Sequence, residues 1–259
     1  MSNRKKTATV GNSPYIHCEE EHNLKAPSII VPDLIEYLRP RSVVDVGCGI
    51  GTFLCVFQKS GIDDIVGLDG NWVNRSLLAI DEKYFIETDL DKPLDLGRRF
   101  DLVVSLEVAE HLAPESADRF VGDLCKAGDV VVFSAAVVGQ GGQNHTNEQH
   151  PAYWQAKFEA RGYHFYDVFR ERYWDESEID WWYSQNMFLA ARDQVVLPPE
   201  VAETRVDGAV RSYIHPELLR GMVIKVAYLE KMAADSKSLG GIARRGARFI
   251  KRRLWRPTD

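Results

Sequence analysis

The chain of 259 residues is predicted to be an α/β protein built on a doubly wound, mostly parallel sheet, followed by a helical C-terminal extension. Three observations support this fold class. Short segments rich in Val, Ile and Leu alternate with segments of helical pattern, which is typical of parallel strands covered by helices on both faces. Gly47, Gly49 and Gly51 follow the first of these segments, where a strand is expected to turn sharply into a helix. Acidic residues follow several other segments, at the carboxyl ends where such sheets bind ligands.

The expected elements begin with a short helix. Pro32 is expected to open it and Pro40 to stop it, and its apolar stripe consists of Leu34, Ile35 and Leu38. Five strands are predicted to follow, separated for the most part by helices, at residues 42–46, 64–68, 84–87, 101–106 and 129–136. A helix from Pro151 to about Arg161 then precedes two more strands, at residues 163–169 and 186–191.

The chain is expected to divide into a lead-in or lid at residues 1–26, an α/β domain at residues 27–192 and a helical extension at residues 193–259. The extension contains one long helix, from Pro216 to about Ala234. No apolar stretch is long enough to span a bilayer, and the N-terminus leads into no secretion segment, so a cytoplasmic protein is expected. The cysteines show neither paired nor zinc-ligand spacing and are expected to be reduced thiols: Cys18, Cys48, Cys55 and Cys125.

The formal charge of -6 argues against a dedicated nucleic-acid binder. The charge is unevenly spread, because seven Lys and Arg residues crowd residues 244–256 among Ile, Phe, Leu and Trp. Such a mixture is typical of helices that lie in a membrane interface, so peripheral contact with the inner membrane face is a possibility that the sequence does not favour. The favoured interpretation of the tail is a helix end that is solvated or packed on a partner. The sequence leaves the oligomeric state open.

The glycine turn and the acid after the second strand together indicate the kind of ligand. Asp69 ends that strand at the distance where a ribose-binding acid is expected. The glycine order is G-x-G-x-G, unlike that of dinucleotide enzymes, and no basic residue lies between Asp45 and Val56 to meet a pyrophosphate. These features favour an adenosine ligand without phosphates. For each acid taken alone, a helix cap or a solvated side chain is the alternative.

At residues 44–51 the run Val-Asp-Val-Gly-Cys-Gly-Ile-Gly resembles the first motif of class I S-adenosylmethionine-dependent methyltransferases, and the resemblance extends over roughly residues 27–192. It implies a seven-stranded Rossmann-like sheet with an antiparallel last strand. It also implies S-adenosylmethionine as the cofactor and S-adenosylhomocysteine as the product. The implied cofactor-binding residues are Asp45, Gly47, Cys48, Gly49, Gly51, Asp69, Gly70, Asp89, Leu90, Leu106 and Glu107.

By this resemblance the turn accommodates the methionine part, Asp69 holds the ribose and Asp89 accepts from the adenine amine. The overall pattern resembles bacterial methyltransferases of glycan and natural-product pathways.

Methyl transfer requires an aligned nucleophile and, for a hydroxyl, a group that removes its proton. Histidine is the natural base near neutral pH. His111 follows the fourth strand, where it is either a base or structural, whereas His145 and His150 lie in a polar loop after the fifth strand. His145 is preferred over His150.

A divalent metal is a second possibility that the sequence does not favour. Glu107, Glu110 and His111 would share one face of a helix, and His145 or His150 would complete a site of oxygen and nitrogen ligands. This arrangement is similar to that of small-RNA 2′-O-methyltransferases, but the rest of their pattern is not evident.

The expected function is therefore O-methylation of a small polar acceptor, such as a sugar, a glycan or a natural product. The aromatic residues of the second half either stack on this substrate or belong to the core: Tyr153, Trp154, Tyr173, Trp174, Trp181, Trp182 and Tyr183. The alternatives are N-methylation, metal-assisted O-methylation and a non-catalytic cofactor-binding subunit. A nicotinamide-dependent oxidoreductase or epimerase would require a different glycine spacing at the turn.

Overall fold

The computed structural model describes residues 23–237. Almost all of the expected lead-in, together with Cys18 and the basic tail, lies outside the described residues. Contacts divide the chain into one unit that ends at Tyr213 and a second that begins at Ile214. The described part of the second unit consists mainly of helix α8 (Pro216–Lys237). No helix of residues 23–237 is long and apolar enough to cross a bilayer.

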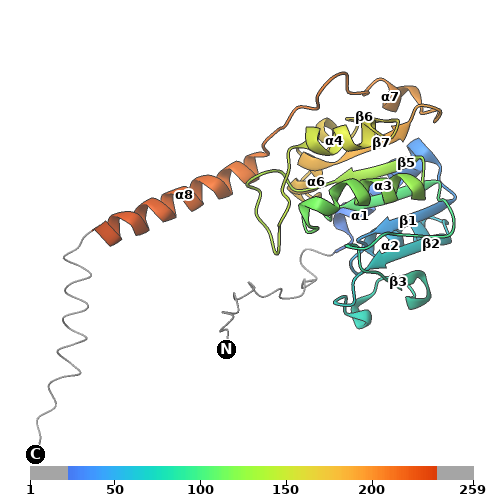
Figure 1. Cartoon of the computed structure of the whole chain (residues 1–259), viewed down its shortest axis with the longest axis horizontal. Coiled ribbons are helices and arrows are strands. Elements are labelled where there is room, and N and C mark those ends of the chain that lie inside the picture. Colours follow the sequence, from blue (N-terminus) through green and yellow to red (C-terminus); the bar gives the residue numbers. More distant parts are fainter. Residues whose placement is uncertain (1–22, 238–259) are drawn as a thin grey trace, which may run out of the picture. The chain divides into compact units, whose positions relative to one another are not determined.

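The first unit is built on one seven-stranded sheet in the order β3-β2-β1-β4-β5-β7-β6 (Figure 1). Its strands are β1 (Ser42–Val46), β2 (Asp64–Asp69), β3 (Phe85–Glu87), β4 (Leu102–Leu106), β5 (Val130–Ser134), β6 (Tyr163–Tyr166) and β7 (Phe188–Arg192). Strands β1 to β5 pair in parallel, and β7 runs antiparallel to both β5 and β6. This confirms the predicted sheet and its antiparallel last strand. The strand order reverses between β1 and β4, so a ligand is expected at their carboxyl ends.

Helices cover both faces of the sheet: α1 (Lys25–Leu38), α2 (Thr52–Lys59), α3 (Ala117–Ala127), α4 (Pro151–Glu159), α5 (Arg170–Tyr173), α6 (Trp181–Asn186) and α7 (Pro199–Ala202). Short 3-10 turns are η1 (Arg75–Leu77), η2 (Glu82–Tyr84) and η3 (Pro114–Ser116). Neighbouring residues of β1 supply the two core layers, since Val43 packs with α1 and α2 whereas Val44 packs with α3 and α4. This alternation explains why valines that point to opposite faces of the strand are all buried.

The first helix is longer than the sequence predicts. Pro32 lies inside α1, which begins at Lys25, so the prediction that this proline opens the helix was wrong. A proline inside a helix removes one backbone hydrogen bond. Here Ile30 and Val31 are fully buried against the sheet, and this burial offsets the loss. The predicted stop is confirmed, because Arg39 adopts a left-handed conformation just before Pro40.

Two segments outside the sheet pack onto it. The insertion between β6 and β7 forms α5 and α6, and it is joined to α1 by Asp33, which accepts hydrogen bonds from Arg172 (2.6 and 2.8 Å) and from the Tyr173 hydroxyl (2.6 Å). After β7, the backbone N–H of Val206 donates to the Phe165 carbonyl (2.9 Å). The compact unit therefore continues beyond residue 192, where the sequence places the domain boundary.

Candidate functional site

The turn between β1 and α2 is formed by three glycines in conformations that other residues rarely adopt. The φ angles of Gly47, Gly49 and Gly51 are 86°, 53° and 81°. A Cβ atom on Gly47 would lie 2.3 Å from a methyl carbon of Val108, so a larger residue does not fit. Helix α2 starts at Thr52, directly after the turn. The amide groups at its N-terminus thus face the end of the sheet where a ligand is expected.

Asp69 ties this turn to the end of β2. Its carboxylate accepts hydrogen bonds from the backbone N–H groups of Gly49 (2.7 Å) and Gly70 (2.6 Å). Burial raises the pKa of Asp69, while these two donors and the Trp72 side chain oppose the rise. Trp72 also covers Gly70, where a Cβ atom would lie 2.2 Å from its indole ring. Sequence reasoning missed Trp72, although an aromatic residue three positions after a predicted ribose-binding acid was a usable signal.

A second acid lies beside the first. Asp45 near the end of β1 is buried, and burial, with a smaller contribution from the Asp69 carboxylate, raises the pKa of Asp45 to about 8. Two acids at one turn, with no cation between Asp45 and Val56, suit a positively charged ligand. Three further predicted cofactor residues are buried: Cys48, Leu90 and Leu106.

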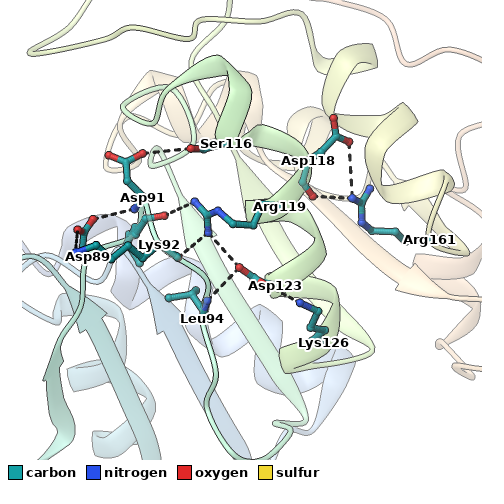
Figure 2. A network of polar contacts seen from close by, with 11 residues as sticks. Asp89, Asp91, Lys92, Leu94, Ser116, Asp118, Arg119, Asp123, Lys126 and Arg161 are labelled. Carbon is teal, nitrogen blue, oxygen red and sulfur yellow. Dashed lines mark hydrogen bonds and ion pairs between the residues drawn. The ribbon is translucent and has the colours of Figure 1, made fainter.

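Asp89 belongs to a polar network that fixes the segment after β3 (Figure 2). It is exposed, lies 2.9 Å from the Lys92 ammonium and accepts a hydrogen bond from the Asp91 backbone N–H. The hydrogen bond from Lys92 lowers the pKa of Asp89. Arg119 of α3 donates to the carbonyls of Leu90 (2.8 Å) and Lys92 (2.7 Å), which anchors this segment. An adenine amine would therefore have to share Asp89 with Lys92.

The turn after β4 carries a strained glutamate. Glu107 has a φ angle of 54°, an uncommon value for a residue other than glycine, and such strain is frequent at functional sites. Its carboxylate accepts hydrogen bonds from the side-chain amides of Gln140 (2.9 Å) and Asn186 (3.1 Å). Burial raises the pKa of Glu107. These bonds bring together the turn after β4, the loop after β5 and the end of α6. Gln140 is a site residue that no sequence pattern singles out.

Glu110, His111 and His145 form a cluster next to this turn. Their ligand atoms all lie within 4.8 Å of one another, and the two imidazole rings meet edge to face with centroids 4.8 Å apart. Within residues 23–237, the buried Glu110 carboxylate accepts no hydrogen bond of normal geometry, and burial, followed by the charge of Glu107, raises its pKa. Burial and the neighbouring His145 lower the pKa of His111 to about 4.

The segment from Glu107 to His111 forms a turn in the structure, so the prediction that a helix gives these side chains one face was wrong. The backbone bends here because Glu107 adopts its left-handed conformation directly after β4. The Glu107 carboxylate consequently contacts the side-chain amides of Gln140 and Asn186. It is not part of the cluster of Glu110, His111 and His145.

The loop between β5 and α4 is organised by Glu148. Its carboxylate accepts hydrogen bonds from the backbone N–H groups of Gly139 (2.8 Å) and Gly141 (2.6 Å), and lies 2.9 Å from Nδ1 of His145. The backbone N–H groups of Thr146 and Asn147 both donate to the Glu110 carbonyl (2.9 Å each). These bonds hold the loop against the turn after β4 and place His145 beside His111.

The third candidate base has different surroundings. His150 is exposed at the N-terminus of α4, and its ring lies 3.4 Å from the Ser212 hydroxyl. It is not part of the cluster of Glu110, His111 and His145.

Of the seven aromatic residues that the sequence singles out in the second half, two are buried and five are partly buried, Tyr153 and Trp174 among the latter. Trp154 and Tyr173 are buried in the core, which excludes them from a stacking role. The three consecutive aromatics of α6, residues 181–183, are partly buried, and Tyr183 packs edge to face on Phe53 of α2.

The chain was compared with protein families and with solved structures. A family model described as a methyltransferase domain matches residues 25–185, which is more than half of the chain. The sequence matches no curated protein. A SAM-dependent methyltransferase from Archaeoglobus fulgidus is 22% identical, with 56% of this chain and 72% of that chain covered and a TM-score of 0.43.

Two further solved structures are also similar to this chain. Magnesium protoporphyrin IX methyltransferase (ChlM) from Synechocystis PCC 6803, with bound SAM, is 17% identical over 71% of this chain and 87% of that chain, with a TM-score of 0.48. The sugar N-methyltransferase KedS8 from Streptoalloteichus sp ATCC 53650 is 16% identical over 73% of this chain and 99% of that chain, with a TM-score of 0.51. Sheet order, glycine turn and family match agree, and the chain therefore belongs to the class I methyltransferases that use S-adenosylmethionine.

Proposed function

We propose that this methyltransferase transfers the methyl group to a hydroxyl of a small polar acceptor, such as a sugar, a glycan or a natural product, with His145 as the general base. The observation that carries the proposal is the pairing of His145 with Glu148, whose carboxylate lies 2.9 Å from Nδ1. A proton on Nδ1 leaves Nε2 free of hydrogen as the acceptor. The carboxylate also stabilises the imidazolium that forms when the base takes a proton.

The other histidine of the cluster is less suited to this role. A pKa of about 4 makes His111 a weak base near neutral pH, because efficient proton transfer needs a pKa close to the working pH. His111 instead packs against the His145 ring and limits its orientations.

The neighbouring polar groups support a polar acceptor. The Glu107 carboxylate and the Gln140 and Asn186 amides supply several donors and acceptors at the carboxyl end of the sheet. Such groups bind hydroxyl-rich molecules through fixed hydrogen bonds. The likeness to the sugar N-methyltransferase KedS8 shows the fold alone, and N-methylation is therefore an outcome that product analysis must decide.

The test is turnover of isotopically labelled S-adenosylmethionine with a panel of sugars, amino sugars and hydroxylated natural products. His145→Gln should lower kcat by about 100-fold or more, because a positioned base contributes about that much, while the affinity for the cofactor stays unchanged. His150→Gln, the control, should retain the wild-type rate. Full activity of His145→Gln, or methyl groups found on nitrogen, would contradict the proposal. No turnover with any acceptor, despite cofactor binding, would favour a non-catalytic subunit.

Metal-assisted O-methylation is the second candidate, and it rests on the Glu110 carboxylate. Among residues 23–237 this group is buried without a hydrogen-bond partner of normal geometry, and it lies next to two imidazoles, a combination that suits a divalent cation. The contact from Glu148 to His145 would fix the ring of a ligating histidine. The same turnover assay distinguishes the candidates. Activity unchanged after exhaustive chelation, with no metal in the purified protein, excludes the metal, whereas loss with recovery on adding Mg²⁺, Mn²⁺ or Zn²⁺ establishes it.

A further inference from the structure

Trp72 is an exposed aromatic side chain beside the carboxylate that is expected to hold the cofactor ribose. It is 44% exposed, although its ring packs on the backbone of Gly70, the residue directly after Asp69. A Cβ atom at residue 70 would lie 2.2, 2.3 and 2.4 Å from three carbons of the six-membered ring, so this contact requires glycine. The indole therefore lies at the end of β2, where a sheet of this kind binds its ligand.

The Asp69 carboxylate has little acceptor capacity left in this arrangement. An ionised carboxylate offers about four lone pairs, shared equally between its two oxygens. The backbone N–H groups of Gly49 and Gly70 occupy one on each oxygen (2.7 and 2.6 Å), and the Trp72 indole N–H donates to a third. About one lone pair remains, whereas the two hydroxyls of a ribose need two.

Of the groups around Asp69, the indole is the one that can leave. The two backbone donors belong to the glycine turn and to the end of β2, so they cannot withdraw without a change of fold. The charge of Arg75 also lowers the pKa of Asp69, but its guanidinium donates to Glu87 (3.1 Å) and lies 3.8 Å from the centroid of the Phe85 ring. A ribose that binds Asp69 through both hydroxyls must therefore displace Trp72.

The backbone around Trp72 is anchored, so the indole can move by side-chain rotation alone. The Val73 N–H donates to the Gly70 carbonyl (3.3 Å), and the Val73 side chain is buried. Farther along the segment, the Ala79 N–H donates to the carbonyl of Ile50 in the glycine turn (2.8 Å). Exposed side chains change rotamer within nanoseconds, without unfolding of their neighbours.

We propose that Trp72 competes with the cofactor ribose for Asp69 and thereby sets the affinity for S-adenosylmethionine. The indole N–H donates to the carboxylate until the two ribose hydroxyls replace it, and the ring then turns away from Asp69. A hydrogen bond to a charged group is among the stronger ones, so breaking it lowers the net affinity for the cofactor. The inference rests on the placement of the ribose at Asp69 and is independent of the acceptor and of the catalytic base.

The experiment compares the binding of S-adenosylhomocysteine and of its 2′-deoxy analogue to the full chain by calorimetry. Trp72→Phe keeps an aromatic ring but removes the donor, and it should bind S-adenosylhomocysteine at least about threefold more tightly than the wild type. The gain for the 2′-deoxy analogue should stay below about twofold, because its single ribose hydroxyl needs only the lone pair that remains. Asn71→Ala, the matched control, changes an exposed side chain of the same segment and should leave both affinities unchanged.

Tryptophan fluorescence reports the movement of the indole. Binding of S-adenosylhomocysteine should change the emission of the wild type, and Trp72→Phe should lose most of this change. Trp72→Leu also lacks the donor and should bind S-adenosylhomocysteine as tightly as Trp72→Phe does. Circular dichroism should give the same helix content for all variants, which excludes general unfolding.

Three results would overturn the proposal. The first is equal affinity of the wild type and Trp72→Phe for S-adenosylhomocysteine, and the second is an equal gain for both ligands. The third is weaker binding by Trp72→Phe and Trp72→Leu, which would make the indole part of the bound site. Failure of the ribose placement itself gives a different result, because Asp69→Asn would then bind S-adenosylhomocysteine as the wild type does.

Discussion

Asp45 is the residue whose protonation we expect to be coupled to cofactor binding. Its pKa of about 8 keeps it protonated at neutral pH in the free protein, because burial and the neighbouring Asp69 both disfavour its charged form. S-adenosylmethionine carries a positively charged sulfonium and ammonium group. A cation bound near Asp45 stabilises its carboxylate and so lowers its pKa.

Cofactor binding near neutral pH should therefore release protons, and affinity should increase as the pH rises through about 8, where the free protein already loses the proton. Calorimetry in buffers of different ionisation enthalpy counts the released protons. Asp45→Asn should release fewer protons and bind with less pH dependence. Equal proton release by the wild type and Asp45→Asn would show that this carboxyl group is not near the cofactor.

The same pKa has an effect on stability. A folded-state pKa above the unfolded value of 3.8 means that the protonated form stabilises the fold, so this contribution is fully present below pH 3.8 and is lost progressively as the pH rises from there to about 8. The wild type should thus lose stability relative to Asp45→Asn over this range, as thermal unfolding curves at several pH values would show.

The turn between β1 and α2 depends on the close approach of Gly47 to Val108 as well as on backbone conformation. Gly47 and Gly61 both have positive φ angles, of 86° and 91°, but a Cβ atom would clash with Val108 only at Gly47 and would meet open space at Gly61. Gly61→Ala should therefore lower the free energy of unfolding by about 1 kcal/mol, and Gly47→Ala by about 1–3 kcal/mol more. Chemical denaturation measures both changes. Equal losses in the two variants would show that a Cβ atom at residue 47 is accommodated beside Val108 with no further loss of stability.

The strands and their polar ends could be predicted from sequence because they depend on local patterns. The β1 segment is apolar on both faces, and glycines that directly follow such a strand indicate a sharp turn. The loop after β5 could not be predicted in detail, since its shape depends on hydrogen bonds from Gly139, Gly141 and His145 to Glu148. Pro32 inside α1 shows the same limit, because burial of the helix overrides the local preference of proline.

For the molecule as a whole, the resemblance to class I methyltransferases predicted the sheet and its antiparallel strand, which the strand pairing confirms. It could not predict where the compact unit ends. Residues 193–213 join that unit through bonds such as the one from the Val210 N–H to the Gln155 side chain (2.7 Å), which no sequence pattern indicates.

The proposed reaction site lies within the first unit, which ends at Tyr213. The proposed function rests on a fold in which the cofactor occupies the end of β1 and β2.

The most direct test of that claim is calorimetric titration of S-adenosylmethionine into the wild type, Asp69→Asn and Asp63→Asn. Asp69 ends β2 beside the glycine turn, whereas Asp63 precedes the opposite end of the same strand and is exposed. The wild type and Asp63→Asn should bind one equivalent with equal affinity, and Asp69→Asn should bind at least about tenfold more weakly, because a charged hydrogen bond is lost. Equal affinity of all three proteins, or binding of NAD in place of S-adenosylmethionine, would contradict this placement of the cofactor.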